Sequence, residues 1–244
     1  MESHNPKFIL SVNLNSDKFI DEQLKNIREH LSYEYQIVLN CDEKMYELMD
    51  NKKYENVCVN PIAINKKRFH GTIFRGVFEN IRYSCLSYKF DYFIVLSARS
   101  FFFRKLNNET IKTFYDDNKR YDTHHSEFRP KTPLERKKWP RWMWSAFRKS
   151  EFYAYLRKHS YNFQKKMHEG LLLTRKNCED LICFFDQNDE LYNSVIGAKN
   201  LPMEEIVIQT LLLNWQNFST GMGVWPGGET NSENIKKRFI MKKY

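Results

Sequence analysis

Two adjacent carboxylates stand directly before a strongly apolar run in the last quarter of the sequence. Glu204 and Glu205 precede Ile206, Val207 and Ile208, and Pro202 predicts the first turn of a helix at this point. The positive end of a helix dipole favours carboxylates in the first turn, and this alone explains the pair. The alternative is that one carboxylate faces an enclosed site, where partial desolvation fits it to act as a general base.

A second polar feature interrupts an apolar strand. Residues 90–96 are almost entirely aromatic or aliphatic and predict a strand buried on both faces, but Ser97, Ala98, Arg99 and Ser100 follow before three phenylalanines. In an open α/β sheet, ligands bind at the carboxyl ends of the strands. We therefore expect Ser97, Ala98 and Arg99 to line a binding site. A salt bridge from Arg99 to a neighbouring loop is the alternative.

Tryptophans alternate with basic residues in a third segment. Trp139, Trp142 and Trp144 lie among arginines and lysines in residues 135–149. Such rings stack on nucleic-acid bases or on the face of a sugar, and packing of a long loop against the sheet explains them equally well. The sequence contains no helix-turn-helix, zinc-finger or RNP-like motif. We assign Trp142 and Trp144 as candidates for stacking on a sugar, and we expect no nucleic-acid partner.

Several familiar catalytic and nucleotide-binding motifs are absent from the sequence. It has no GxGxxG after the first strand, no GxxxxGK[ST], no GxSxG and no HExxH. Phosphate binding must therefore depend on side chains or helix ends. The five cysteines are odd in number and form no CxxC pair, which predicts reduced core residues instead of a disulfide framework or a zinc site. We expect His124 and His125 to form a solvent-exposed pair in a polar loop.

Composition bounds the class of protein. The 244 residues are 41% hydrophobic and 16% aromatic, enough for one α/β domain with a sizeable core. No segment reaches the length of a membrane span. The net charge of +9 favours an anionic partner, such as nucleic acid, an acidic membrane surface or the diphosphate of a nucleotide sugar. The alternative is that the charge only keeps the protein soluble. The many Lys, Asn, Ile and Tyr residues hint at an AT-rich genome, as in a large virus or a parasite.

The hydrophobic periodicity predicts alternating strands and helices over the first hundred residues. Strand, helix and strand in succession form units that join parallel strands by right-handed crossovers, so we expect an open, mostly parallel sheet with helices on both faces. Beyond residue 105 the periodicity weakens, and we expect irregular chain with short helices. The expected strands are 8–14, 35–40, 55–60 and 90–97, and the expected helices are 17–32, 44–50, 70–89, 150–168 and 202–215; residues 170–185 predict a strand leading into a helix.

Four stretches, in this order along residues 35–213, resemble the core-2/I-branching family of glycosyltransferases. "VLNCDEKMYE" resembles a family strand with a "VDEK"-type tip, and "FHGTIFRGVFENIRYSCLSYKFDYFIVLSARSFFFR" resembles its helix followed by "(W/F)DYF(I/V)xLSGxDFPL". "MHEGLLLTRKNCEDLI" is similar to its "GSxxFxLSRxFVxYV" segment, and "PMEEIVIQTLL" to its "SPDExxxxTLL" segment. Each motif is weak alone, and their shared order gives the set its specificity.

The resemblance implies a GT-A (Rossmann-like) fold: α/β, one domain over 1–244, with a mostly parallel central sheet flanked by helices. It implies a nucleotide-sugar-binding half at 1–104 and an acceptor-binding and catalytic half at 105–244. The implied enzyme is an inverting hexosyl- or pentosyltransferase that moves a sugar from a nucleotide-diphosphate sugar, with a UDP-sugar expected, to a hydroxyl of a glycan or glycoprotein. Counting back from Thr210 places Glu205 on the family's base, and one extra residue after Pro202 keeps Glu204 as the alternative.

The resemblance also implies how the diphosphate is held. The family lacks the DxD pair that carries Mg²⁺ or Mn²⁺ in other GT-A enzymes and uses basic side chains near the C-terminus, so we expect no metal and no cofactor. The candidate donor-binding residues are Ser11, Asn13, Asp42, His70, Arg75, Ser97, Ala98, Arg99, Lys236, Lys237 and Arg238. The candidate acceptor-binding residues are Trp142, Trp144, His168, Glu169 and Gly170.

Departures from the family pattern qualify the resemblance. Ala98, Ser100 and Phe102 stand where the family has Gly, Asp and Pro, and the family's lumenal disulfides and membrane anchor are missing. We therefore expect a bacterial or viral enzyme in the cytoplasm, which for a virus is the host cytoplasm. Two alternatives stay open: a metal-dependent GT-A enzyme that recruits Mg²⁺ or Mn²⁺ through Asp42 or another carboxylate, and a basic, aromatic-rich nucleic-acid-binding module. The oligomeric state is left open.

Overall fold

The structure of the protein is a computed structural model, and it describes residues 6–102, 104–107, 141–163, 169–215, 220–221 and 240–242. The strands are β1 (Phe8–Asn13), β2 (Tyr35–Asn40), β3 (Val57–Val59), β4 (Tyr92–Ser97), β5 (Ser100–Phe102), β6 (Leu171–Thr174), β7 (Thr220–Gly221) and β8 (Ile240–Lys242). The helices are α1 (Ile20–His30), α2 (Glu43–Lys52), α3 (Thr72–Ser87), α6 (Arg141–Arg148), α7 (Glu151–Lys158), α8 (Arg175–Asp186), α9 (Asp189–Gly197), the 3-10 turn η1 (Met203–Glu205) and α10 (Val207–Asn214).

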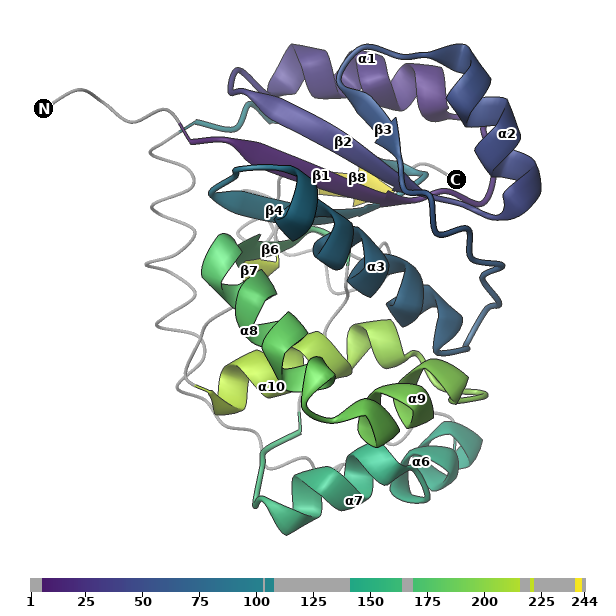
Figure 1. Ribbon diagram of the computed structural model, residues 1–244, viewed down its shortest axis with the longest axis vertical. Coiled ribbons are helices and arrows are strands. Elements are labelled where there is room, and N and C mark those ends of the chain that lie inside the picture. The colour runs from purple at the N-terminus through teal and green to yellow at the C-terminus, as the bar shows by residue number, and fades with distance from the viewer. Residues whose placement is uncertain are drawn as a thin grey trace, which may run out of the picture.

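A mixed, mostly parallel sheet organises the chain (Figure 1). Its strand order is β3-β2-β1-β4-β6-β7, and the four strands from β3 to β4 run parallel to one another. β6 pairs antiparallel with β4, and β7 with β6, while β5 and β8 form a separate antiparallel ribbon. The expected α/β class, with a mostly parallel sheet flanked by helices, is confirmed. The division of the chain at residue 104 stays a prediction.

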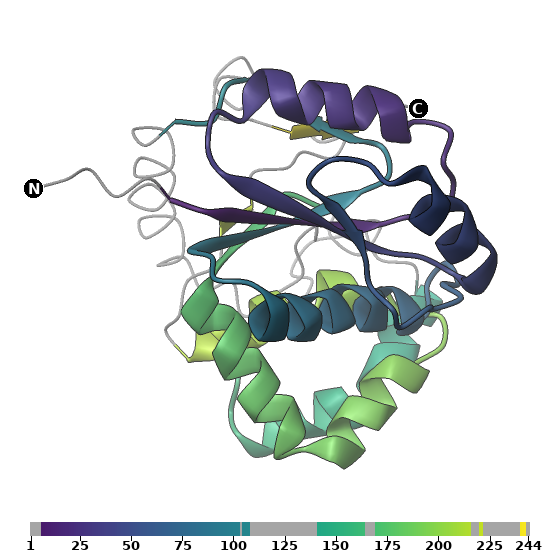
Figure 2. The same cartoon turned by 45° about the horizontal axis from the view of Figure 1, so that its top comes forward.

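The central strands separate two apolar layers because successive side chains of a strand point to opposite faces. In β1, Phe8, Leu10 and Val12 pack with α1 on one face, whereas Ile9 packs with α3 on the other. Figure 2 shows α1 and α3 on opposite sides of the sheet. The α3 layer also contains α8, α9 and α10, which cover α3 on its outer side. Burial on both faces explains the nearly continuous apolar sequence of these strands.

A glycine allows α9 and α3 to meet at close range. A Cβ atom on Gly71, the residue before α3, would lie 2.0 Å from the carbonyl oxygen of Val195 and 2.7 Å from the carbonyl carbon of Ile196. The Gly71 N–H donates to the carbonyl oxygen of Ala198 at 2.9 Å. The end of α9 is therefore held against the start of α3, and this contact places the segment that follows α9.

Three sequence expectations for the second half of the chain need correction. The helix expected at 150–168 ends at Lys158, because Ser160 adopts a left-handed conformation (φ 54°) and the Tyr161 N–H turns back to the Leu156 carbonyl at 2.8 Å. The helix expected from Pro202 begins with a 3-10 turn, since Glu205 N–H bonds the Pro202 carbonyl three residues back, and α10 starts only at Val207. α9 was not predicted as a separate helix.

Within the described residues, no helix combines the length and the apolar character needed to cross a bilayer.

Candidate functional site

The carboxyl ends of β1, β2 and β4 form the candidate site. Asn13, the last residue of β1, lies in register with Asn40 of β2 on one side and with Ser97 of β4 on the other. The connection from β1 to β2 passes over one face of the sheet through α1, and the connection from β3 to β4 passes over the other through α3. Strand order therefore reverses at β1, and open α/β sheets bind ligands outside the carboxyl ends at such a point.

Four residues from different elements meet at this edge, and we call them the amide–lysine cluster: Asn13, Asn40, Lys66 and Gly76. A Cβ atom on Gly76 of α3 would lie 2.6 Å from Oδ1 of Asn13, 3.0 Å from Oδ1 of Asn40 and 3.2 Å from Cδ of Lys66. A glycine at position 76 thus lets α3 approach the ends of β1 and β2 closely enough for both amides to face it.

Lys66 is the cation of the cluster. Its Nζ atom donates to the backbone oxygen of Asn40 at 2.9 Å, to Oδ1 of Asn40 at 2.9 Å and to the Ile64 carbonyl at 3.3 Å. Burial lowers the pKa of Lys66 to about 8, against the opposing effects of Cys41 and Asp42. Burial also raises the pKa of the adjacent Cys41 thiol to about 11. Burial of a charged ammonium group destabilises the folded protein. Such destabilising groups are common in functional sites.

Asn13 offers a hydrogen-bond acceptor that the described residues leave open. Its Nδ2 atom donates to the Ile73 carbonyl at 3.3 Å, and its side chain is 6% exposed. Its Oδ1 atom is buried and accepts no hydrogen bond from any described residue. Buried polar atoms are nearly always paired in folded proteins, so this oxygen calls for a donor such as an N–H or O–H of a ligand.

A buried amide network holds α3 in position over the cluster. Asn80, one helical turn beyond Gly76, donates from Nδ2 to the Ser11 hydroxyl and to the Val38 carbonyl, both at 3.0 Å. Asn60 donates to Oδ1 of Asn80 at 3.0 Å. Satisfied buried networks of this kind fix one packing arrangement. Ser11, a candidate donor-binding residue, is therefore fully buried within β1, two residues before its end, and its hydroxyl serves the contact with α3.

Two acceptor candidates, Glu169 and Gly170, lie at the same edge. β6 runs antiparallel to β4, so the residues just before β6 lie beside the carboxyl end of β4. Gly170 donates its N–H to the Val95 carbonyl at 2.7 Å and has a left-handed conformation (φ 81°), which favours glycine. Glu169 is 5% exposed. The antiparallel strand thus brings a buried carboxylate to the edge where β4 ends.

The carboxylates Glu204 and Glu205 belong to η1, which packs against α3. The segment before η1 runs beside the start of α3, where Leu201 N–H donates to the Phe69 carbonyl at 3.0 Å and His70 pairs with Lys199 across an antiparallel bridge. Glu204 is 5% exposed, and Glu205 is half-buried. Because a 3-10 helix turns about 120° per residue, the two side chains leave the turn in different directions.

The polar break after residue 96 is a tight turn between β4 and β5. The Gln23 side chain of α1 donates to the carbonyl oxygens of Ser97 and Ser100, both at 2.8 Å. The Ser97 N–H donates to the Ser100 hydroxyl at 3.0 Å. Ala98 packs against the apolar layer on the α1 side, whereas Arg99 is exposed. Gln23 therefore fixes the turn and leaves Arg99 at the carboxyl edge.

Asp42 and His70 have local hydrogen-bond partners, and Arg75 lies on α3. Oδ1 of Asp42 accepts from the Met45 N–H at 2.9 Å and caps α2. Nδ1 of His70 accepts from the Thr72 N–H at 3.2 Å, and burial lowers the pKa of His70, helped by Lys67 and Lys199. Arg75 is half-buried on α3. Burial raises the pKa of Tyr192 in α9, and the charge of Arg75 opposes this rise.

Several candidates fall outside what the structure describes. They are His168, Lys236, Lys237 and Arg238, and the expected loop residues His124, His125 and Trp139. Trp142 and Trp144 lie in α6, and their side chains are not described. β8, which follows the basic segment, pairs with β5 directly after the Ser97–Ser100 turn. The assignment of these residues to binding roles stays a prediction.

The structure thus brings Asn13 and Ser97 together, with Glu169 and Gly170 beside the end of β4 and Glu204 near the start of α3. Sequence reasoning missed three members of the cluster: Asn40, Lys66 and Gly76. Asn40 ends a predicted strand, exactly where a polar tip residue is expected, and could have been found. Lys66 resembles any other lysine of a basic chain, and Gly76 any helical glycine, so their proximity is evident only from the fold. In the described part of the chain, no three His, Cys, Asp or Glu side chains gather in a way that could hold a metal ion.

Comparisons with known proteins give little further information. No protein-family model matches the chain, and no curated protein matches it. A similar solved structure is that of residues 1–349 of TarS, a glycosyltransferase from S. aureus, with a TM-score of 0.32 and 15% sequence identity. The similarity covers 46% of this chain and 33% of the TarS chain. This chain therefore spans only about a third of that structure. Membership of the core-2/I-branching family stays a prediction.

Proposed function

We propose that the protein is an inverting glycosyltransferase that uses a nucleotide-diphosphate sugar. The observation that carries the proposal is the buried Oδ1 atom of Asn13, which has no hydrogen-bond partner among the described residues and lies at the point where the strand order reverses. Buried carboxylates at Glu169 and Glu204 lie on segments brought to the same region. A hydrogen-bond acceptor for a nucleotide, together with carboxylates for an acceptor hydroxyl, is the set of groups that sugar transfer requires.

The donor that fits best is a UDP-sugar. A uracil ring carries an N–H, and its ribose carries hydroxyls, so either can donate to the Asn13 amide oxygen. The diphosphate needs positive charge close by. Lys67 and Lys199 act together on His70 just before α3, which indicates a positive field at the N-terminal end of this helix. The C-terminal lysines and arginine at 236–238 belong to the same proposal as diphosphate ligands.

The proposed chemistry balances with the groups at hand. A glutamate takes the proton of the acceptor hydroxyl, and the hydroxyl oxygen forms a bond to the anomeric carbon as the bond from that carbon to the diphosphate breaks. The nucleoside diphosphate leaves with the electron pair, and fixed cations favour the charge that develops on it. Glu204 is the more buried carboxylate and fits the desolvation argument, whereas the resemblance points to Glu205. We propose that one of the two is the base.

A turnover assay tests the proposal. The protein is incubated with a panel of nucleotide sugars and glycan acceptors, with and without EDTA, and nucleoside diphosphate release is measured. We expect release from at least one donor, unaffected by EDTA. Replacing the base, by Glu204→Gln or Glu205→Gln, should lower turnover about 10²-fold or more. Glu190→Gln is the matched control, because Glu190 is an exposed glutamate in the first turn of α9.

The outcomes separate the alternatives. Loss of activity in EDTA that Mn²⁺ or Mg²⁺ restores would replace the metal-independent mechanism by the metal-dependent one. Normal turnover by both glutamine variants would remove this pair from the mechanism. No turnover and no binding of any nucleotide sugar, together with salt-sensitive binding of single-stranded nucleic acid, would overturn the proposal in favour of a nucleic-acid-binding module. The cytoplasmic location expected from the sequence stays a prediction.

A further inference from the structure

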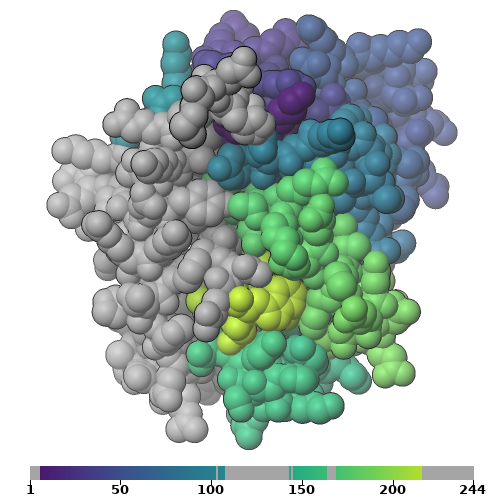
Figure 3. Space-filling model, turned by 60° about the vertical axis from the view of Figure 1, so that its left-hand side comes forward, coloured from purple at the N-terminus to yellow at the C-terminus, as the bar shows by residue number. Residues whose placement is uncertain are grey.

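A pair of thiols lies at the opposite end of the sheet from the candidate site. Cys85 is in the last turn of α3, and Cys178 is in the first turn of α8. These helices pack against each other, as their contacts in the apolar layer show. The α8 end of this region is tied to the amino end of β4, because the Arg175 N–H donates to the Asp91 carbonyl at 3.0 Å. Figure 3 shows the surface of this part of α8 directly beside that of the α3 and β4 region.

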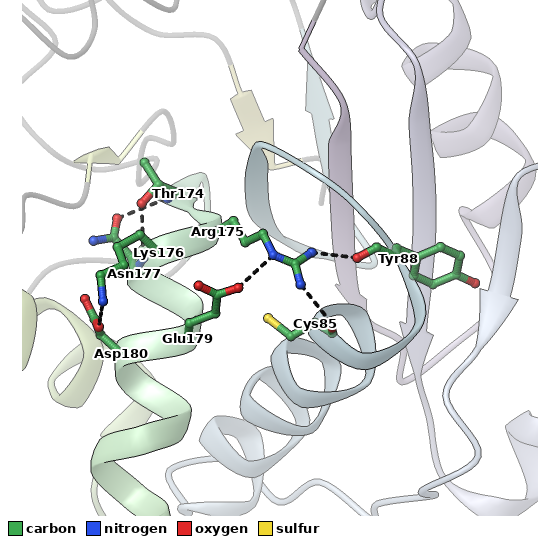
Figure 4. Close-up of polar contacts among 8 residues, drawn as sticks. All are labelled: Cys85, Tyr88, Thr174, Arg175, Lys176, Asn177, Glu179 and Asp180. Atoms are coloured by element: carbon green, nitrogen blue, oxygen red, sulfur yellow. Dashed lines mark hydrogen bonds and ion pairs between the residues drawn. The ribbon is translucent and has the colours of Figure 1, made fainter.

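Arg175 fixes the geometry around Cys85 (Figure 4). Its guanidinium group donates to the carbonyl oxygens of Tyr88 at 2.7 Å and Cys85 at 3.1 Å, and to Oε1 of Glu179 at 2.8 Å. It also lies over the Phe90 ring at 5.1 Å from the ring centroid. Three hydrogen bonds and a ring contact hold this cation beside the end of α3, so its charge acts on Cys85 at a fixed position.

The two cysteines lie where α3 packs against α8. Cys178 follows Arg175 by three residues and so lies on the face of α8 that meets α3. Cys178 belongs to the apolar layer against which Cys85 packs. Cys85 is partly exposed, whereas Cys178 is completely buried. Cys85 is therefore partly accessible to a small oxidant, whereas Cys178 is not.

The surroundings make the two sulfurs chemically unequal. The hydrogen bond from Cys178 lowers the pKa of Cys85, against the opposing effect of partial burial; Arg175 lowers it further and Glu179 raises it. Burial raises the pKa of Cys178 well above its usual value, and the contact with Cys85 adds to this. The thiolate is the form that reacts with peroxides, so Cys85 is the attacking sulfur and Cys178 keeps its proton until a neighbouring sulfur is oxidised.

We propose that Cys85 and Cys178 are an oxidation site for hydrogen peroxide, at which the two thiols convert to a disulfide that joins α3 to α8. The Cys85 thiolate attacks one peroxide oxygen, the O–O bond breaks, and hydroxide leaves, which gives Cys85 sulfenic acid. The sulfur of Cys178 then attacks the sulfenic sulfur, its proton leaves with the hydroxyl as water, and the disulfide forms. Peroxide is reduced to two waters, and the two thiols lose two hydrogens in total.

The other cysteines provide internal references. Cys183 is exposed on α8, five residues beyond Cys178. Cys58 lies 3.0 Å from the Tyr83 hydroxyl, and Cys41 is buried with its pKa raised to about 11. Exposure alone would make Cys183 the first thiol to be oxidised. The proposal predicts instead that Cys85 and Cys178 are lost together, so the identity of the oxidised residues discriminates between the two.

The test is peroxide titration of the reduced full-length protein. Residual thiols are blocked with an alkylating reagent in denaturant, and peptides are mapped by mass spectrometry. We expect a Cys85–Cys178 linked peptide, a loss of two of the five thiols of the chain, and full recovery of both on reduction. Cys183→Ser should give the same result. In Cys178→Ser, checked for folding by circular dichroism, Cys85 should instead accumulate as sulfenic acid that dimedone traps.

A structural readout accompanies the chemistry. A cross-link between residues 85 and 178 closes a long loop, so the oxidised protein should unfold several degrees above the reduced one. The proposal is overturned if Cys85 and Cys178 both stay alkylatable at peroxide levels that consume Cys183, or if the disulfides found join Cys183 residues of different molecules. It is also overturned if Cys178→Ser leaves Cys85 in the thiol form. None of these results depends on the proposed glycosyltransferase activity.

Discussion

At the scale of single residues, the candidate site is defined by polar atoms that the fold keeps buried. Asn13 was expected at the site from the sequence, and the structure places it at the end of β1 with a buried amide oxygen that accepts no hydrogen bond from the described residues. Ser11 was also expected to bind the donor, but its hydroxyl accepts a hydrogen bond from Asn80 of α3. A sequence shows that a polar residue ends a strand, but it does not show which neighbours already satisfy it. That difference separates these two residues.

We expect the buried Lys66 to make the free energy of unfolding depend on pH. Its pKa in the folded protein is about 8, below the usual value of 10.5. Below pH 8 the lysine is charged in both the folded and the unfolded chain, and burial of the charge opposes folding. As pH rises from 8 towards 10.5, the folded protein releases the proton before the unfolded chain does, so this group makes the free energy of unfolding increase with pH.

Urea unfolding measures this effect. From pH 7.5 to 9.5, wild-type protein should gain about 2 kcal/mol of unfolding free energy relative to Lys66→Met, which has no titrating group at this position. The difference between the two proteins removes the contributions of groups they share. If the unfolding free energies of the two proteins change in parallel over this range, Lys66 has an ordinary pKa, and the assignment of a buried cation to the cluster is wrong.

At the scale of elements, the site depends on how α3 is placed over the sheet. The amide network at Asn80 fixes the middle of the helix, and Gly71 fixes its start against α9. The same contact brings the chain after α9 beside residues 69–71 and so places η1 with its two carboxylates. We infer that the packing of α9 on α3 is the main determinant of where Glu204 and Glu205 lie.

A pair of glycine substitutions tests this contact. Gly71→Ala should destabilise the protein by about 3 kcal/mol or more, because the new methyl group meets backbone atoms of Val195 and Ile196, which cannot move aside as a flexible side chain can. Gly197→Ala is the matched control, since nothing lies within 4 Å of the added methyl. It should change the unfolding free energy by less than about 1 kcal/mol. Denaturant midpoints measure both, and equal midpoints would contradict the close approach.

The sequence predicted the first half of the molecule better than the second. Strands β1, β2 and β4 combine continuous apolar residues with parallel connections, and these local signals place them within a residue or two. The antiparallel direction of β6 and the pairing of β5 with β8 depend on contacts distant in sequence, which periodicity does not reveal. The separate helix α9 was missed because it continues the apolar pattern of α8 after only two intervening residues.

At the scale of the whole molecule, one sheet separates two regions with different chemistry. The amide–lysine cluster lies at the carboxyl ends of β1 and β2, and the segments that carry Glu169 and Glu204 lie beside the end of β4 and near the start of α3. The amino end of β4 lies beside Arg175 and the Cys85–Cys178 pair. α3 connects the two regions, since it carries Gly76 in its first half and Cys85 in its last turn. The proposed oxidation at one end and the proposed nucleotide binding at the other can therefore be measured independently.

We propose that a nucleotide binds at the amide–lysine cluster. Calorimetric titration of UDP and UDP-sugars into wild-type protein, Gly76→Ala and Gly197→Ala tests this proposal. A methyl group at position 76 would displace the side chains of Asn13, Asn40 and Lys66. We expect the nucleotide to bind wild type and Gly197→Ala with equal affinity. It should bind folded Gly76→Ala at least about tenfold more weakly, which is the loss expected for one hydrogen bond. Equal affinity in all three proteins, or no nucleotide binding to wild type, would contradict it.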